Sequence, residues 1–141
     1  MTIIVDTNVI IATLIRAGIV RGILTGHPGT FATPASCLEE SWETRGDWNR
    51  QGVPEDVIRE ALDLLARRVV IVVPDSEFQG RLAEAAGLIP DPDDAPVVAL
   101  ALAIDNEGIW TFNTRDFAPP RLLARVRVLT TGDVKRLLEG S

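Results

Sequence analysis

Four acidic residues stand where a parallel α/β sheet would gather functional side chains. They are Asp6, Glu40, Asp94 and Asp116. Each follows an apolar run typical of a strand or lies near the start of a helical pattern. Because ligands bind outside the carboxyl ends of the strands in open α/β sheets, we expect these four carboxylates to share one crevice.

Four carboxylates in one crevice would repel one another strongly unless some were protonated or a multivalent cation lay among them. Mg²⁺ or Mn²⁺ suits such a site, because hard cations take oxygen ligands and keep several waters. The arrangement is typical of phosphodiester hydrolysis, in which the cation activates water and offsets charge on the attacking and leaving oxygens. The sequence therefore predicts a metal-dependent hydrolase with the four acids as ligands.

Helix capping is the competing interpretation of these acids. Asp, Thr and Asn are common N-caps, and Asp6, Thr7 and Asn8 come directly before a helical pattern. Taken singly, each acid is more easily explained as a cap or as a solvated surface group. The coincidence of four such positions favours a shared site.

Composition excludes other kinds of site. Cys37 and His27 are the only cysteine and the only histidine, so an intramolecular disulfide is impossible and a Cys/His zinc site is effectively excluded. His27 lies in a Pro/Gly turn away from any serine or cysteine nucleophile motif, which leaves Ser/His and Cys/His catalysis without support. Any bound metal is expected to have oxygen ligands.

The net charge of −6 and a pI of about 4.7 argue against broad electrostatic attraction to nucleic acid. The basic residues are nonetheless unusual, because thirteen of the fourteen are arginine and only Lys135 is lysine. Guanidinium suits bidentate phosphate contacts better than ammonium does. We expect a few arginines near the crevice to contact the phosphates of the substrate, with Arg115, beside Asp116, as the first candidate.

Strand-like and helix-like segments alternate along the chain. Strands are expected at residues 2–5, 30–33, 69–73, 108–112 and 126–129, and helices at 9–24 with a break near Gly18, 34–50, 57–65, 76–87, 97–104 and from 131 onward. Ser36 and Ser76 are expected to open their helices as N-caps of capping boxes. The β-branched run at 69–73 is typical of a strand covered on both faces. The pattern predicts one three-layer α/β/α domain over residues 1–141 with a mostly parallel sheet.

The longest apolar run falls far short of a membrane span, and a basic region followed by an apolar stretch is missing from the amino terminus. The cytoplasm is therefore the expected location, with no membrane partner.

Three motifs carry a family resemblance, together with the helical acid Glu40. They are residues 3–10 (IIVDTNVI), 91–103 (DPDDAPVVALALA) and 111–117 (TFNTRDF). In their order and spacing they resemble the PIN-domain nucleases, the group that includes the VapC-type toxins. The resemblance covers almost the whole chain.

The resemblance implies a five-stranded parallel sheet of order 3-2-1-4-5 and Mg²⁺- or Mn²⁺-dependent cleavage of RNA. It implies catalytic and metal-binding roles for the four acids, and Thr7, Asn8, Asp91 and Asn113 are expected to support them. Glu39 and Glu43 lie close enough to Glu40 that the identity of the helical acid stays open. Because Asn113 stands where many members carry another acid, the number of bound metals also stays open.

The resemblance also implies which proteins this chain would bind. The family often dimerises, and its toxin branch is inhibited by a small antitoxin protein. Trp42, Trp48 and the apolar stripe from Val57 to Leu65 also favour a homodimer, because they offer more apolar surface than a small monomer usually exposes. Trp110, inside an expected strand, is predicted to lie in the core.

Two other functions compete with a nuclease. A non-catalytic PIN-like module that binds proteins would have the same motifs. A phosphoacceptor or phosphatase domain would also place Asp6 at a strand end, but it expects a lysine near the phosphate, and the phosphatase needs a second acid where Asn8 stands. Lys135 lies far along the chain in the closing helix, which disfavours this alternative.

Overall fold

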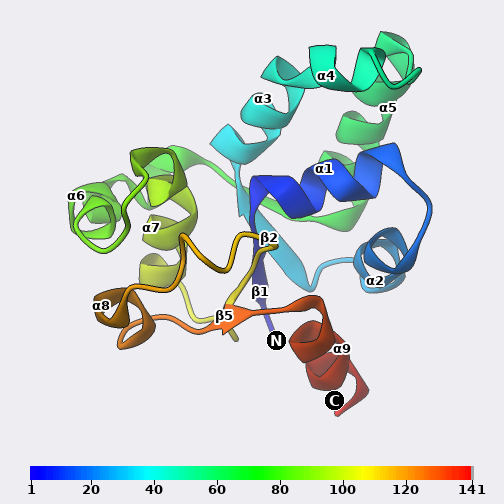
Figure 1. Cartoon of the computed structure of the whole chain (residues 1–141). Coiled ribbons are helices and arrows are strands. Elements are labelled where there is room, and N and C mark those ends of the chain that lie inside the picture. The colour runs from blue at the N-terminus through cyan, green and yellow to red at the C-terminus, as the bar shows by residue number, and fades with distance from the viewer. Residues whose placement is uncertain (141) are drawn as a thin grey trace.

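Five short strands form one fully parallel sheet in the computed structural model, which describes residues 1–140 (Figure 1). The strands are β1 (Ile3–Val5), β2 (Phe31–Pro34), β3 (Ile71–Val73), β4 (Ile109–Trp110) and β5 (Val128–Leu129). Their order is β3-β2-β1-β4-β5. The predicted sheet order is therefore confirmed; Ser141, the last residue of the expected domain, lies outside the described residues.

Helices cover both faces of the sheet and make the three predicted layers (Figure 1). They are α1 (Thr7–Ile15), α2 (Ile19–Gly26), α3 (Ala35–Glu43), α4 (Arg45–Asn49), α5 (Glu55–Leu64), α6 (Leu82–Ala86), α7 (Ala95–Ala103), α8 (Pro120–Leu123) and α9 (Thr131–Glu139). Strand β1 shows how the layers are separated. Ile4 packs into the core on the α7 side, whereas Ile3 and Val5 point into the core shared with α1 and α9.

Helix α7 is the central helix that its apolar sequence predicts. Six of its nine residues are buried, because it packs against the sheet and against α6. After it the chain turns back through Gly108, whose φ of +143° disfavours any side chain. A Cβ there would lie 2.8 Å from the carbonyl oxygen of Arg127. Glycine at this position therefore lets β4 pair with β5.

The helix predicted at residues 34–50 is wrong as a single element. It divides at Thr44 into α3 and α4, and Ser36 does not cap it. Instead the carboxylate of Asp75, which follows β3, accepts a 3.2 Å hydrogen bond from the backbone N–H of Ser36. The start of α3 is thus bound by an acid 39 residues further along the chain.

The segment after β3 also differs from its prediction. Ser76 does not open a helix, since residues 75–81 form two short 3₁₀ turns before α6 begins at Leu82. Between these turns Phe78 is buried in the core beneath α7.

Strand β3 lies at the edge of the sheet, and the prediction that the run at residues 69–73 is covered on both faces is wrong because Ile71, at the start of the strand, is open to solvent. Ile71 is 46% exposed, and residues 65–69 form a π-helical turn that ends α5 before the strand starts. The β-branched run reflects strand propensity more than double coverage.

The tryptophans divide between core and surface. Trp110 lies in the core as predicted, and Trp48 is only 3% exposed because it packs within its own chain. Trp42 is partly exposed and lies beneath the guanidinium groups of Arg45 and Arg59. Trp48 therefore offers no surface to a partner, which removes one of the sequence arguments for a homodimer.

Across residues 1–140, no single helix is both long and apolar enough to cross a membrane. Helices α1 and α2 taken together have the length and composition of a span, but they meet at a bend of 106°.

Candidate active site

Asp6 ends β1 and starts α1, which places its carboxylate at the carboxyl edge of the central strand. One oxygen accepts a 2.8 Å hydrogen bond from the Thr7 backbone N–H, so Asp6 does cap the helix. The other accepts a 2.9 Å bond from the hydroxyl of Thr111, which follows β4. Burial raises the pKa of Asp6, although both hydrogen bonds oppose the rise. Capping and a site role therefore coexist in this residue.

Thr111 is a site residue that the sequence reasoning did not single out. Its hydroxyl is buried, donates to Asp6, and accepts from the backbone N–H of Asn113 at 3.0 Å. The amide of Asn8 approaches the same hydroxyl at 3.4 Å. A threonine at the end of a buried strand, inside one of the recognised motifs, was the available signal. Thr111 joins the first and last motifs of the site.

Glu40 reaches the site from α3. Its Oε2 accepts a 3.1 Å hydrogen bond from the hydroxyl of Thr7, and desolvation raises its pKa, with further contributions from Asp6, Asp93 and Asp91. Glu39 and Glu43 line a groove beside Trp42, and Glu43 also lines a second cavity together with Glu40 and Asp93. Of the three candidate glutamates, Glu40 is the one whose carboxylate is tied to Thr7.

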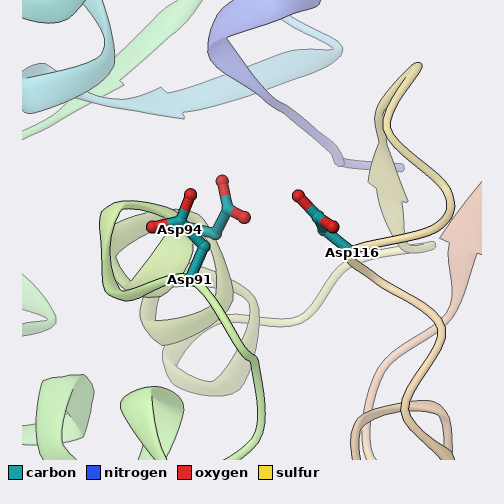
Figure 2. Close-up of side chains that lie close together, drawn as sticks. All are labelled: Asp91, Asp94 and Asp116. Atoms are coloured by element: carbon teal, nitrogen blue, oxygen red, sulfur yellow. The ribbon is translucent and has the colours of Figure 1, made fainter.

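Asp91, Asp94 and Asp116 form the tightest acidic group. One carboxylate oxygen from each lies within 4.8 Å of the other two. Figure 2 shows Asp91 and Asp94 on the turn that leads into α7, with Asp116 facing them from the loop after β4. Asp91 was expected only to support the site, yet the structure places it in this group. Asp6 and Glu40 lie outside it but close enough to influence Asp94 electrostatically.

Asp94 bears the largest electrostatic cost in this crevice. Its pKa is raised from 3.8 to about 7, mostly by desolvation and further by the charges of Asp6, Asp91, Asp116 and Glu40. Its Oδ2 is buried and has no hydrogen-bond partner within the described residues. Nor does its side chain bond to the backbone at the start of α7, so capping does not explain it.

A divalent cation fits these residues. Their donors are all carboxylate oxygens, which Mg²⁺ and Mn²⁺ prefer, and a cation would satisfy the unpaired Asp94 Oδ2 and offset the mutual repulsion. Asp91, Asp94 and Asp116 are the residues that would hold it, with Asp6 and Glu40 at its margin.

The loop after β4 positions the last acid. Asn113 donates a 2.7 Å hydrogen bond from its side-chain amide to Asp116 Oδ2, so it orients this carboxylate rather than adding a charge. Arg115 between them is exposed and forms no ion pair within residues 1–140. Its guanidinium is therefore free to contact a ligand.

The geometry does not support a cysteine nucleophile or a phosphoacceptor aspartate. Burial raises the pKa of the Cys37 thiol to about 12, so a thiolate nucleophile is not available near neutral pH. Both carboxylate oxygens of Asp6 are already hydrogen-bonded, and Lys135 is exposed on α9, the helix after β5. A phosphoacceptor site built on Asp6 therefore has no support here.

A parallel sheet of order 3-2-1-4-5, with carboxylates gathered at its carboxyl edge, defines an α/β domain with an acidic crevice. The PIN domain model matches residues 4–119, and the chain belongs to that family. The resemblance stated from the motifs is thereby confirmed.

Among solved structures, a toxin-antitoxin complex from Klebsiella pneumoniae has a similar fold. The two chains share 20% sequence identity and a TM-score of 0.64, over 92% of this chain and 98% of that one. A comparison with curated proteins gives no match.

Proposed function

We propose that this protein is a metal-dependent endoribonuclease that hydrolyses phosphodiester bonds of RNA. The observation that carries the proposal is the group formed by Asp91, Asp94 and Asp116, with a buried, unpaired oxygen on Asp94. Membership of the PIN domain family, whose members are commonly nucleases, supports the same conclusion.

The proposed roles follow from the positions of the acids. Asp91, Asp94 and Asp116 hold Mg²⁺ or Mn²⁺, which when bound activates water and offsets charge on the reacting phosphate. Asp6 and Glu40 lie at the margin of this group, where they fix water and further charge around the cation. Thr7, Thr111 and Asn113 hold three of these carboxylates in place through hydrogen bonds, while Asn8 braces Thr111.

We further propose that the protein acts as the toxin of a toxin-antitoxin pair, with a small antitoxin as partner. The support is the similar fold of a chain in a structure described as a toxin-antitoxin complex. Co-expression with the product of an adjacent reading frame, followed by purification of the complex, would test this part.

The decisive experiment is RNA cleavage by the purified protein with Mg²⁺, with Mn²⁺ and with EDTA. We expect cleavage with either cation and none with EDTA. Asp94→Asn should abolish cleavage, whereas Asp105→Asn, an exposed acid in the loop between α7 and β4, should leave it unchanged. Full activity in EDTA, or of Asp94→Asn, would contradict the metal mechanism.

A further inference from the structure

A cleft of about 370 Å³ lies beside the acidic crevice, between the corner that joins α1 to α2 and the loop after β4. Ala12, Arg16 and Ile19 line it from the helices, and Phe112 lines it from the loop. Its volume is within the range of small-molecule pockets, roughly 300–1,000 Å³. We call it the Phe112 cleft.

Hydrogen bonds connect the Phe112 cleft to the acidic crevice. The backbone N–H of Phe112 lies 3.4 Å from the side-chain oxygen of Asn8, and the Asn8 amide approaches the hydroxyl of Thr111, which bonds Asp6. Asn8 and Ala12 are four residues apart on one face of α1, and Arg16 is the extended residue that directly follows the helix. A chain bound across the acids can therefore continue along this face.

The side chain of Phe112 is only partly used for packing in the core. It is 45% exposed, although its ring packs edge-on against buried Trp110 with the centroids 6.5 Å apart. Trp110 is fixed in turn by a 3.1 Å hydrogen bond from its indole to Thr131. One side of the phenyl ring thus packs against Trp110, while much of its surface faces solvent.

The charge of the Phe112 cleft is opposite to that of the acidic crevice. Arg16 is exposed and has no carboxylate partner within residues 1–140. The neighbouring Arg21 is already engaged, because it donates to the carbonyl oxygens of Thr13 and Leu14 at the end of α1. Arg16 is therefore the free cation of the cleft in a chain whose net charge is −6.

We propose that the Phe112 cleft binds one unpaired nucleobase of the RNA substrate, stacked on Phe112, while Arg16 contacts a flanking phosphate. This inference rests on the proposed ribonuclease function and adds a preference for single-stranded RNA. An aromatic ring stacks on any base and suits unpaired segments, whose bases are free to splay out. An acidic polypeptide would suit the same ring and arginine, but the hydrogen bonds that connect the cleft through Asn8 to the acidic crevice favour the RNA substrate as its occupant.

The test measures binding of a fluorescent single-stranded oligoribonucleotide to the Asp94→Asn protein, with Ca²⁺ in place of Mg²⁺ to suppress cleavage. In this background Phe112→Ala should weaken binding about tenfold, in line with the loss of one stacked base. Phe112→Tyr should bind within about twofold of the parent, whereas Phe112→Leu, which is apolar but has no π face, should behave like alanine. Arg16→Ala should reduce the log-log salt slope by about one.

Leu123→Ala is the matched control, because Leu123 on α8 is 50% exposed and should leave RNA binding unchanged. Thermal unfolding of each variant checks that the fold is retained. Equal affinity of Phe112→Ala and the parent, or full rescue by Phe112→Leu, would overturn the stacking role while leaving the nuclease proposal intact. No RNA binding by the wild-type protein with Ca²⁺, whose metal site is intact, would overturn both.

Discussion

The hydroxyl of Thr7 donates a 3.1 Å hydrogen bond to Oε2 of Glu40, which joins the first turn of α1 to α3 beside the acidic crevice. Of the three neighbouring glutamates between which sequence spacing left the choice open, Glu40 is the one that accepts this bond. It also keeps the pKa of Glu40 lower than burial alone would set it.

Removing this bond should change how Glu40 titrates. In Thr7→Val, which keeps the shape of the buried side chain, we expect the pKa of Glu40 to rise further, because the remaining influences all favour the protonated form. Carbon-detected NMR titration of the metal-free protein measures this, with Thr7→Ser as the control that retains the hydroxyl. An unchanged Glu40 titration in Thr7→Val would show that the bond does not persist in solution.

Asp94 should make the metal-free protein less stable as the pH rises. Its folded-state pKa of about 7 is above its ordinary value of 3.8, so the folded protein holds this proton more tightly than the unfolded chain. Stability from this group is complete below about pH 4 and is lost as the pH rises to about 7. Asp94→Asn should therefore show a smaller fall in melting temperature between pH 5 and pH 8 in EDTA.

Asp105→Asn provides the comparison for this experiment, since Asp105 is exposed and lies in the loop between α7 and β4. It should retain the pH dependence of the wild-type protein. A large loss of stability in Asp94→Asn at every pH would instead assign Asp94 a structural role.

Asp91 and Asp93 form a matched pair for testing the metal ligands. Asp91 belongs to the three-carboxylate group, whereas Asp93 on the same turn does not. Asp91→Asn keeps an oxygen to accept the 3.0 Å bond from the Asp93 N–H, so the turn should survive. We expect Asp91→Asn to weaken Mn²⁺ binding by about tenfold or more, a loss seen even for residues that only support a ligand.

Asp93→Asn should change Mn²⁺ affinity by less than about threefold, because it alters only the surrounding charge. Isothermal titration calorimetry measures both variants. Equal losses would show that net charge, rather than direct ligation, determines binding.

Arg115 should contribute one phosphate contact. It is exposed, unpaired and adjacent to Asp116, so Arg115→Ala in the Asp94→Asn background should weaken RNA binding and lower the magnitude of the salt slope by about one. Arg127→Ala makes the same charge change just before β5, at the end of the sheet away from the acids, and should leave the slope unaltered. Identical slopes for both variants would remove Arg115 from the substrate path.

That the protein forms a homodimer remains a prediction, and the apolar surface available for the interface is smaller than the sequence suggested. With Trp48 buried, the exposed apolar residues of α5 are Val57 and Leu64, at 48% and 52% exposure. If they form the interface, Leu64→Lys should give a monomer by light scattering at micromolar concentrations, whereas Leu123→Lys should remain dimeric. A wild-type monomer would contradict the prediction outright.

Sequence reasoning succeeded where one local pattern determined the element. The apolar α7 and the helix start near Thr131 were predictable, and the latter is fixed by a capping box between Thr130 and Asp133. Strand order followed from the family resemblance, because alternation of strands and helices predicts a parallel sheet without ordering its strands.

The sequence analysis missed features that depend on contacts between residues far apart in the chain. Ser36 was expected to cap its helix, but Asp75 provides the cap from a distant segment. Ser76 was expected to open a helix, but residues 75–81 form two 3₁₀ turns with Phe78 buried between them. Thr111 gained its role only through contact with Asp6. Contacts between residues far apart in sequence leave no periodic signal, so local patterns could not predict them.

The bond between Thr111 and Asp6 joins residues 105 positions apart, and its geometry depends on pairing of β1 with β4. Pairing between such distant segments is intrinsically slow, because the entropy of closing a long loop must be overcome first. During synthesis, Asp6 leaves the ribosome long before Thr111 exists to hold it. A growing chain therefore carries its first acid without a formed site, and the crevice is completed only when most of the polypeptide has been translated.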